Sequence, residues 1–225
     1  NLAIAGIAVS TVSLPVLSKL IKNKQISKAN KIQNKSLELS LLLSLPASVA
    51  LIIGSEEIVN ALFGYGSFTE KDIEQTASAL RYFGYGIPAF AMLKIFANFF
   101  FSRDNTTTPF KVSSIVVFIN VIISILFFKH IGFIIIPIAT TLSTWIGVIY
   151  YFCLLIKINY LKVVPTFYIN FSKILFSTFI LSYVFYESLN YFAKNLSYSS
   201  DYKTLYLLFI VIFIALLYFL ICYFL

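Results

Sequence analysis

Residues 76–111 read TASALRYFGYGIPAFAMLKIFANFFFSRDNTTTPFK. Within this stretch, positions 78–101 form a long apolar run whose only charged members are Arg81 and Lys94. A helix needs about 20 mostly apolar residues to cross the hydrocarbon core of a bilayer. A polar segment follows, and a new apolar run begins at position 112. The stretch therefore predicts a membrane-spanning helix, a loop and the start of a second span.

The same alternation of apolar runs and polar loops extends in both directions along the 225 residues. Only 12% of the residues are charged and 60% are hydrophobic, whereas about 25% of a soluble domain is charged. This composition argues against a soluble enzyme, and short alternating strands of the outer-membrane barrel type are not seen. We therefore predict an all-α polytopic membrane protein with seven transmembrane helices, at residues 2–18, 37–54, 78–101, 112–128, 131–156, 174–192 and 204–225.

Basic residues are concentrated in alternate loops between these spans. Loops one, three and five carry 11 Lys and Arg, whereas the opposite side carries five, namely four in its loops and Arg81 near a helix entrance; most acids lie on this second side. Because Lys and Arg accumulate in cytoplasmic loops, the net charge of +8 indicates membrane orientation and not nucleic-acid binding. We predict that loops one, three and five are cytoplasmic. Their basic residues are Lys19, Lys22, Lys24, Lys28, Lys31, Lys35, Arg103, Lys111, Lys157, Lys162 and Lys173.

The first loop, between Leu20 and Lys35, mixes lysines with apolar residues such as Ile26 and Ile32. This pattern suits a short helix lying on an anionic leaflet, which makes membrane lipids a predicted partner. A solvated basic loop that only fixes topology is an equally good interpretation.

Residues for metal or nucleophilic chemistry are scarce. Cys153 and Cys222 both lie in apolar runs, and His130 is the single histidine. We therefore predict no disulfide, no metal site, no cofactor, no catalytic residues and no enzymatic activity. The chain begins at Asn1 without a charged leader, and we interpret it as a fragment that lacks its N-terminal part.

Charged residues near or inside spans are the stronger candidates, because charge at membrane depth is expensive. Lys94 could snorkel to the interface or face an aqueous cavity and attract an anion. Arg81 is better interpreted as an interfacial anchor. Lys35 and Glu38 are spaced i, i+3 and can pair on one helix face, or line a substrate cavity.

Small residues and one proline mark packing and bending sites. Gly84, Gly86 and Pro88 cluster in the third span, where the proline removes a backbone hydrogen bond; they are candidates for a hinge or for a static bend. Two stripes of small residues predict close helix packing: Ala139, Ser143 and Gly147 in the fifth span, and Gly6 and Ser10 in the first.

The stretch quoted above resembles the lipid II flippase family of bacteria (MurJ, also called MviN). That family shows Gly-Leu-Pro, then a Lys, then Tyr-Ala-x-x-Asp-Thr-x-Thr-Pro. The matching features here are Gly86-Ile87-Pro88, Lys94 and the segment from Phe101 to Pro109. Order and spacing fit across roughly residues 2 to 156, and the last two spans match only in position and hydrophobicity.

The resemblance implies the fold of the multidrug/oligosaccharidyl-lipid/polysaccharide exporters, with two six-helix lobes around a central cavity. Residues 1–156 would be a partial second lobe, with five spans, and 157–225 two extra C-terminal helices. The protein would be a multi-pass protein of the bacterial cytoplasmic (inner) membrane. It would be a monomer, with the missing lobe in the same chain.

The implied function is transfer of the peptidoglycan precursor lipid II between leaflets by alternating access. Lys94, with Lys35 and Glu38, would belong to the substrate cavity, and Arg103, Asp104, Thr108 and Pro109 would set the geometry of a cytoplasmic gate or loop. Asp104 is placed to accept hydrogen bonds from backbone N–H groups one to three residues on. Three alternatives stay open: a flippase for another polyprenyl-linked saccharide, a cation-coupled exporter, or an inactive membrane scaffold.

Overall fold

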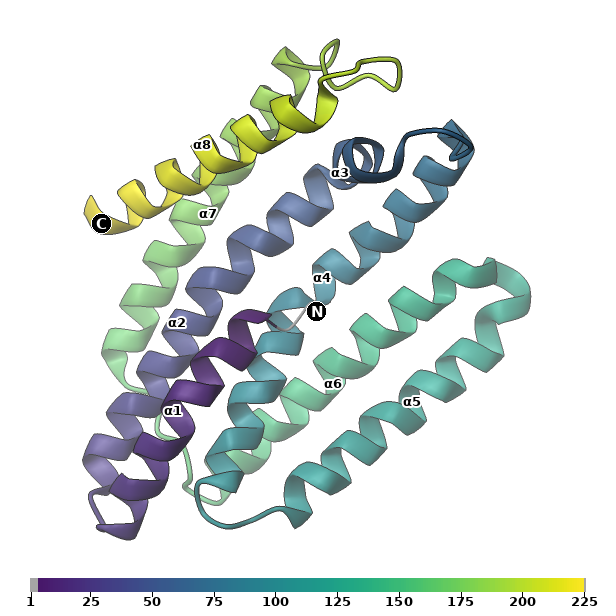
Figure 1. The fold of residues 1–225 in the computed structure, drawn as a ribbon. Helices are drawn as coiled ribbons and strands as arrows, with labels where there is room; N and C mark the ends of the chain where they lie inside the picture. Colours follow the sequence, from purple (N-terminus) through teal and green to yellow (C-terminus); the bar gives the residue numbers. More distant parts are fainter. Residues whose placement is uncertain (1–3, 225) are drawn as a thin grey trace. The chain divides into compact units, whose positions relative to one another are not determined.

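The computed structural model describes residues 4–224 and is all-helical over that range (Figure 1). Long uninterrupted apolar sequences form helices in a bilayer because a helix satisfies its own backbone hydrogen bonds. The helices are α1 (Ile4–Lys22), α2 (Ile26–Ile53), α3 (Ser55–Phe63), α4 (Glu70–Phe101), α5 (Thr107–Ile131), the 3₁₀ turn η1 (Gly132–Ile134), α6 (Ile135–Lys157), α7 (Pro165–Tyr191) and α8 (Lys203–Phe224).

The seven predicted spans correspond to α1, α2, α4, α5, α6, α7 and α8. Within residues 4–224, six segments are long and apolar enough to cross a membrane, and one of them, Thr107–Lys157, contains both α5 and α6. The fold class predicted from the sequence is therefore confirmed. Residues 2, 3 and 225 of the predicted spans lie outside the described residues. The short helix α3 was not predicted.

Several helices extend beyond their predicted apolar limits. α2 begins at Ile26, α4 at Glu70 and α7 at Pro165, each several residues before the predicted span. Polar residues at a helix end continue the backbone hydrogen bonding outside the hydrocarbon layer, so hydropathy alone underestimates helix length. The segment between Leu20 and Lys35 is neither a separate surface helix nor a loop, the two interpretations of its sequence, because residues 26–35 begin α2 and only a tight turn at 23–25 separates α1 from α2.

The chain divides into two compact units. Unit 1 consists of residues 1–44 and 86–171, and unit 2 of residues 45–85 and 172–225. Three helices, α2, α4 and α7, contribute residues to both units.

Unit 1 contains an aromatic core and a helical hairpin. Phe96, Phe99, Phe100 and Tyr151 are buried together in one cluster, with the rings of Phe100 and Tyr151 5.6 Å apart. α5 and α6 run side by side after the chain reverses at η1, where Gly132 has a φ of 75° that favours glycine (Figure 1).

The small-residue stripes pack as predicted. Ala139 and Ser143 are fully buried, and a Cβ on Gly147 would lie 2.5 Å from the Val116 side chain on α5. A Cβ on Gly6 would lie 2.6 Å from the backbone of Ala91, so α1 approaches α4 at this position more closely than any side chain would allow. Small residues allow such approach where lipid offers no hydrophobic driving force.

Three helices of unit 1 end with the same capping motif. Lys24, Asp104 and Asn159, which follow α1, α4 and α6, each have φ = 57°. At each end, the next residue's N–H donates to a carbonyl five positions back: Gln25 to Leu20, Asn105 to Phe100 and Tyr160 to Leu155. These are Schellman motifs. They terminate the helices at loops one, three and five without the usual glycine.

In unit 2, α8 lies beside the second part of α7 (Figure 1). A small core of Val59, Ile73 and Ala77 holds α3 against the start of α4.

Candidate functional site

Lys94 is exposed on α4, although its neighbours Ile95 and Phe96 are buried. No hydrogen bond or ion pair reaches its ammonium group from residues 4–224. An unpaired charge in the middle of a membrane span is expensive in lipid, and such residues usually face a polar cavity or another part of the protein.

The faces of α4 on either side of Lys94 are occupied. On one side, Ala91 packs against Gly6 of α1, and the Asn98 side chain donates to the Ser10 carbonyl of α1 at 2.8 Å. On the other side, Leu93 lies close to Gly147 of α6. Lys94 therefore projects from the strip of α4 between its contacts with α1 and α6.

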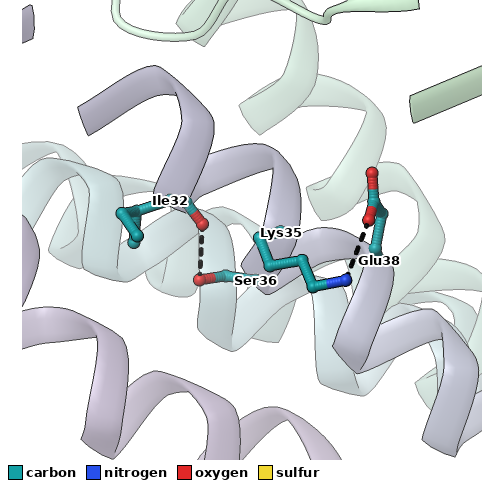
Figure 2. Close-up of polar contacts among 4 residues, drawn as sticks. All are labelled: Ile32, Lys35, Ser36 and Glu38. Atoms are coloured by element: carbon teal, nitrogen blue, oxygen red, sulfur yellow. Dashed lines mark hydrogen bonds and ion pairs between the residues drawn. The ribbon is translucent and has the colours of Figure 1, made fainter. Parts of the chain in front are cut away.

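Lys35 and Glu38 form an ion pair on α2, as the i, i+3 spacing predicts (Figure 2). Lys35 Nζ lies 3.6 Å from Glu38 Oε2, and the Lys35 side chain is 64% exposed whereas that of Glu38 is 9% exposed. Between them, the Ser36 hydroxyl donates to the Ile32 carbonyl at 2.9 Å. An ion pair at this distance whose lysine is largely exposed to solvent contributes little to stability.

Arg103 joins loop three to the linker that follows α6. Its guanidinium donates to the Phe99 carbonyl at 2.6 Å and to the Tyr160 carbonyl at 2.9 Å, and it lies 4.2 Å from the centre of the Tyr160 ring. Partial burial lowers the pKa of Arg103, against a smaller opposite effect of Tyr160. The arginine therefore acts as a bridge between two loops.

The predicted hydrogen-bonding role of Asp104 is wrong. Asp104 is exposed and its left-handed backbone ends α4, whereas the neighbouring Asn105 side chain accepts from the Thr108 N–H at 3.0 Å. The Asn105 side chain thereby satisfies one of the free N–H groups at the start of α5. Pro109 is buried in the first turn of α5, where a missing N–H costs nothing.

Asn34 completes the same loop cluster and was missed in the sequence. It is 2% exposed, donates to the Lys162 carbonyl at 2.8 Å and accepts from the Val164 N–H at 3.2 Å. Arg103 and Asn34 together hold the linker before α7 at three backbone positions. The only signal in the sequence is an asparagine next to a buried face, which does not identify partners about 130 residues away.

The candidate hinge is a continuous helix in this structure, because α4 runs unbroken through Gly84, Gly86 and Pro88. Pro88 has no N–H for the Gly84 carbonyl, and the Ser48 hydroxyl of α2 donates to that carbonyl instead, at 2.8 Å. Serine side chains commonly replace a bond that proline removes inside a membrane. A Cβ on Gly86 would lie 2.8 Å from the Thr141 hydroxyl of α6, so this glycine is required for packing.

Unit 2 holds a buried lysine, Lys203, that was not identified as a candidate from the sequence. Lys203 is 1% exposed and donates to the Gly64 carbonyl at 2.6 Å, the Tyr198 carbonyl at 3.0 Å and the Asn60 side chain at 3.1 Å. Its ammonium also lies 4.2 Å from the Tyr65 ring centre. Asn60 and Gly64 lie at the C-terminal end of α3, so the Lys203 ammonium caps this helix end, where a cation is favourable.

A pocket of about 330 Å³ lies in unit 2 next to Asn60 and Tyr198, and Glu56, Glu57 and Glu70 are among the residues that line it. Burial raises the pKa of Glu57, and the neighbouring Glu56 adds to that effect. A backbone hydrogen bond and Arg81 act in the opposite direction. Among the residues described, no group of His, Cys, Asp and Glu could hold a metal ion.

Comparison with known proteins gives consistent matches. A family model described as lipid II flippase MurJ matches residues 1–208. A probable lipid II flippase MurJ of Rickettsia prowazekii is 38% identical over 154 residues, which are 66% of this chain and 30% of that protein. One of Rhizobium meliloti is 35% identical over 155 residues, which are 69% of this chain and 29% of that protein.

A solved structure of lipid II flippase MurJ in an inward closed conformation is also similar. It is 26% identical with a TM-score of 0.78, and the match covers 98% of this chain and 43% of that one. The chain thus spans about 30% of the length of the curated relatives it matches. It belongs to the MurJ family of lipid II flippases, multi-pass transport proteins of the bacterial inner membrane.

Proposed function

We propose that the full-length protein containing this chain moves lipid II from the inner to the outer leaflet by alternating access. Lipid II joins a diphosphate and a sugar-peptide head group to a long polyprenyl tail. The polar head group crosses hydrocarbon very slowly by itself, because even one charged side chain at the bilayer centre costs about 3 kcal/mol or more. A cavity with basic side chains shields the head group while the tail stays in lipid.

The observation that carries this proposal is the exposed Lys94, which has no partner among residues 4–224 and is the only charged residue between positions 82 and 101 of α4. It lies on α4 between the contacts with α1 and α6, where the other lobe of the full-length protein would enclose it. A lysine needed only for topology would cost less nearer the helix end. We therefore assign Lys94 the electrostatic contact with the anionic head group.

The remaining candidate residues take supporting roles in this proposal. Arg103, Asp104, Thr108 and Pro109 shape the cytoplasmic loop, where Arg103 ties two loops together and Asp104 supplies the turn. Gly84, Gly86 and Pro88 would let α4 bend during the cycle. Residues 1–156 would be part of the second lobe, 157–225 the two added helices, and the protein a monomer.

Lys35 and Glu38, also predicted to line the cavity, form an ion pair with each other, and this proposal assigns the head-group contact to Lys94 and not to them. The same pair bears on the cation-coupled exporter. That function calls for an acid buried in a span, and the buried Glu38 already has a basic partner.

The proposal is tested by expressing the full-length gene in a bacterium depleted of its own lipid II flippase. Growth should be restored, and lipid II should become accessible at the outer face of the membrane. Growth without outward lipid II would contradict flipping and favour the scaffold. Outward movement of a different polyprenyl-linked saccharide, with lipid II retained inside, would assign the other substrate.

A further inference from the structure

We propose that a groove between α1 and the cytoplasmic half of α2 binds one anionic phospholipid, with an acyl chain in the groove and the phosphate at Lys35. The groove has a volume of about 410 Å³, within the range of ordinary ligand pockets. The residues that line it come from α1 and α2 alone, all within unit 1.

The lining of the groove matches a hydrocarbon chain. It is formed mainly by aliphatic side chains, among them Val9, Val12, Val16, Ile32 and Leu39. Val12 is 74% exposed and Val16 44% exposed on membrane-spanning α1, so apolar side chains form an open wall. The one hydroxyl from α2, that of Ser36, is already bonded to the Ile32 carbonyl and adds no free polar group.

The charge at the rim of the groove matches an anionic head group. Lys35 is the only charged residue in the lining, and its side chain is 64% exposed. Glu38 lies 3.6 Å from the ammonium but is 9% exposed, so the carboxylate faces the protein while the ammonium is open to a second, outer partner. The preceding segment carries Lys19, Lys22, Lys24, Lys28 and Lys31 with no acid, which attracts anionic lipids to this end.

The occupant of this groove is a resident phospholipid and not the transported lipid. Lys94, the charge assigned to the transported head group, does not line the groove, and neither does any other residue of α4. The groove opens along the exposed face of α1, on the side of the membrane where the lysines of loop one are predicted to lie. The inference therefore stands whether or not lipid II is the substrate.

The test uses the purified full-length protein with an equimolar mixture of phosphatidylglycerol and phosphatidylcholine, and native mass spectrometry to count retained lipids. The wild type should retain phosphatidylglycerol about two- to fivefold more strongly, the range for one partly exposed charge contact. Lys35→Gln should remove this preference. Ala8→Phe, which places a ring in the groove from an exposed position, should lower the retention of both lipids.

Lys31→Gln is the matched control, because Lys31 is exposed one turn away on α2 and does not line the groove. It should leave lipid retention unchanged. An equal loss with Lys31→Gln and Lys35→Gln would overturn the site in favour of a diffuse basic surface. Unchanged retention in Ala8→Phe would mean that protein covers the groove. Displacement of phosphatidylglycerol by added lipid II would mean that the substrate binds there. Either result overturns the proposal.

Discussion

Two lysines in this chain have opposite surroundings. Lys203, at the start of α8, is 1% exposed, and its ammonium donates to three oxygen acceptors. Lys94, within α4, is exposed and has no partner among residues 4–224. A buried lysine with every donor used stabilises its surroundings, whereas an unpaired one inside a span gains nothing locally. The difference separates a charge that holds the fold from one that is available to a ligand.

The largest effect is expected for Lys203→Met. The substitution removes the donor for Asn60, Gly64 and Tyr198, and each buried acceptor left unpaired costs about 1 kcal/mol or more. We expect the free energy of unfolding to fall by about 3 kcal/mol, measured by denaturation of the purified full-length protein. Lys194→Met, at an exposed lysine in the loop between α7 and α8, is the control and should change the free energy of unfolding by less than about 0.5 kcal/mol. Equal stabilities for the two variants would refute the structural role of Lys203.

Asn34 in unit 1 is a second buried polar residue whose hydrogen bonds hold a loop, and it tests the same structural role as Lys203. Asn34→Ala removes the side-chain bonds to Lys162 and Val164, and we expect a loss of about 1–3 kcal/mol in unfolding free energy. Asn23→Ala, in the exposed turn before α2, provides the matched control. Protection of the 158–164 backbone from hydrogen exchange should fall only in the Asn34 variant. Normal protection there would show that Arg103 alone holds the linker.

Glu57 is a partly buried carboxylate, and it extends the comparison from the two lysines to an acidic group. Burial raises its pKa above the ordinary value of 4.5, so the folded state favours the protonated form. Its contribution to stability is therefore complete below pH 4.5 and decreases as the pH rises through the raised pKa of the folded state. Glu57→Gln, which is always neutral, should flatten this part of the pH–stability profile. A profile unchanged by the substitution would show that Glu57 is ionised without cost.

The smallest effect is expected at Asp104. Its φ of 57° favours glycine, so Asp104→Gly should raise the free energy of unfolding by up to about 1 kcal/mol, and Asp104→Asn should be neutral. Complementation should be retained in both variants if the residue only terminates α4. Loss of flipping in both variants, at normal protein level, would instead assign its carboxylate a charge role.

The spans were predictable because a membrane span depends only on consecutive residues, so an apolar run such as 78–101 is sufficient to predict its helix. The close packing at Gly147 and Gly6 was predictable for a similar reason, since small residues at helical spacing indicate close approach of helices. The surroundings of Lys203 were not predictable, because two of its three acceptors are backbone carbonyls, which every residue carries. The Asn34 clamp was missed because it pairs positions far apart in sequence. Asp104 was assigned to the wrong helix end, because a short polar residue can serve either a helix stop or a helix start.

The most direct test of the central claim is a comparison of Lys94→Met and Lys94→Arg in the full-length protein, in a strain depleted of its own flippase. Methionine keeps the length of the side chain and removes the charge, whereas arginine keeps the charge. If Lys94 contacts the anionic head group, Met should abolish growth and outward movement of lipid II at normal protein level, and Arg should restore part of both. Full complementation by Lys94→Met at normal protein level would contradict the account and leave Lys94 as an interfacial anchor.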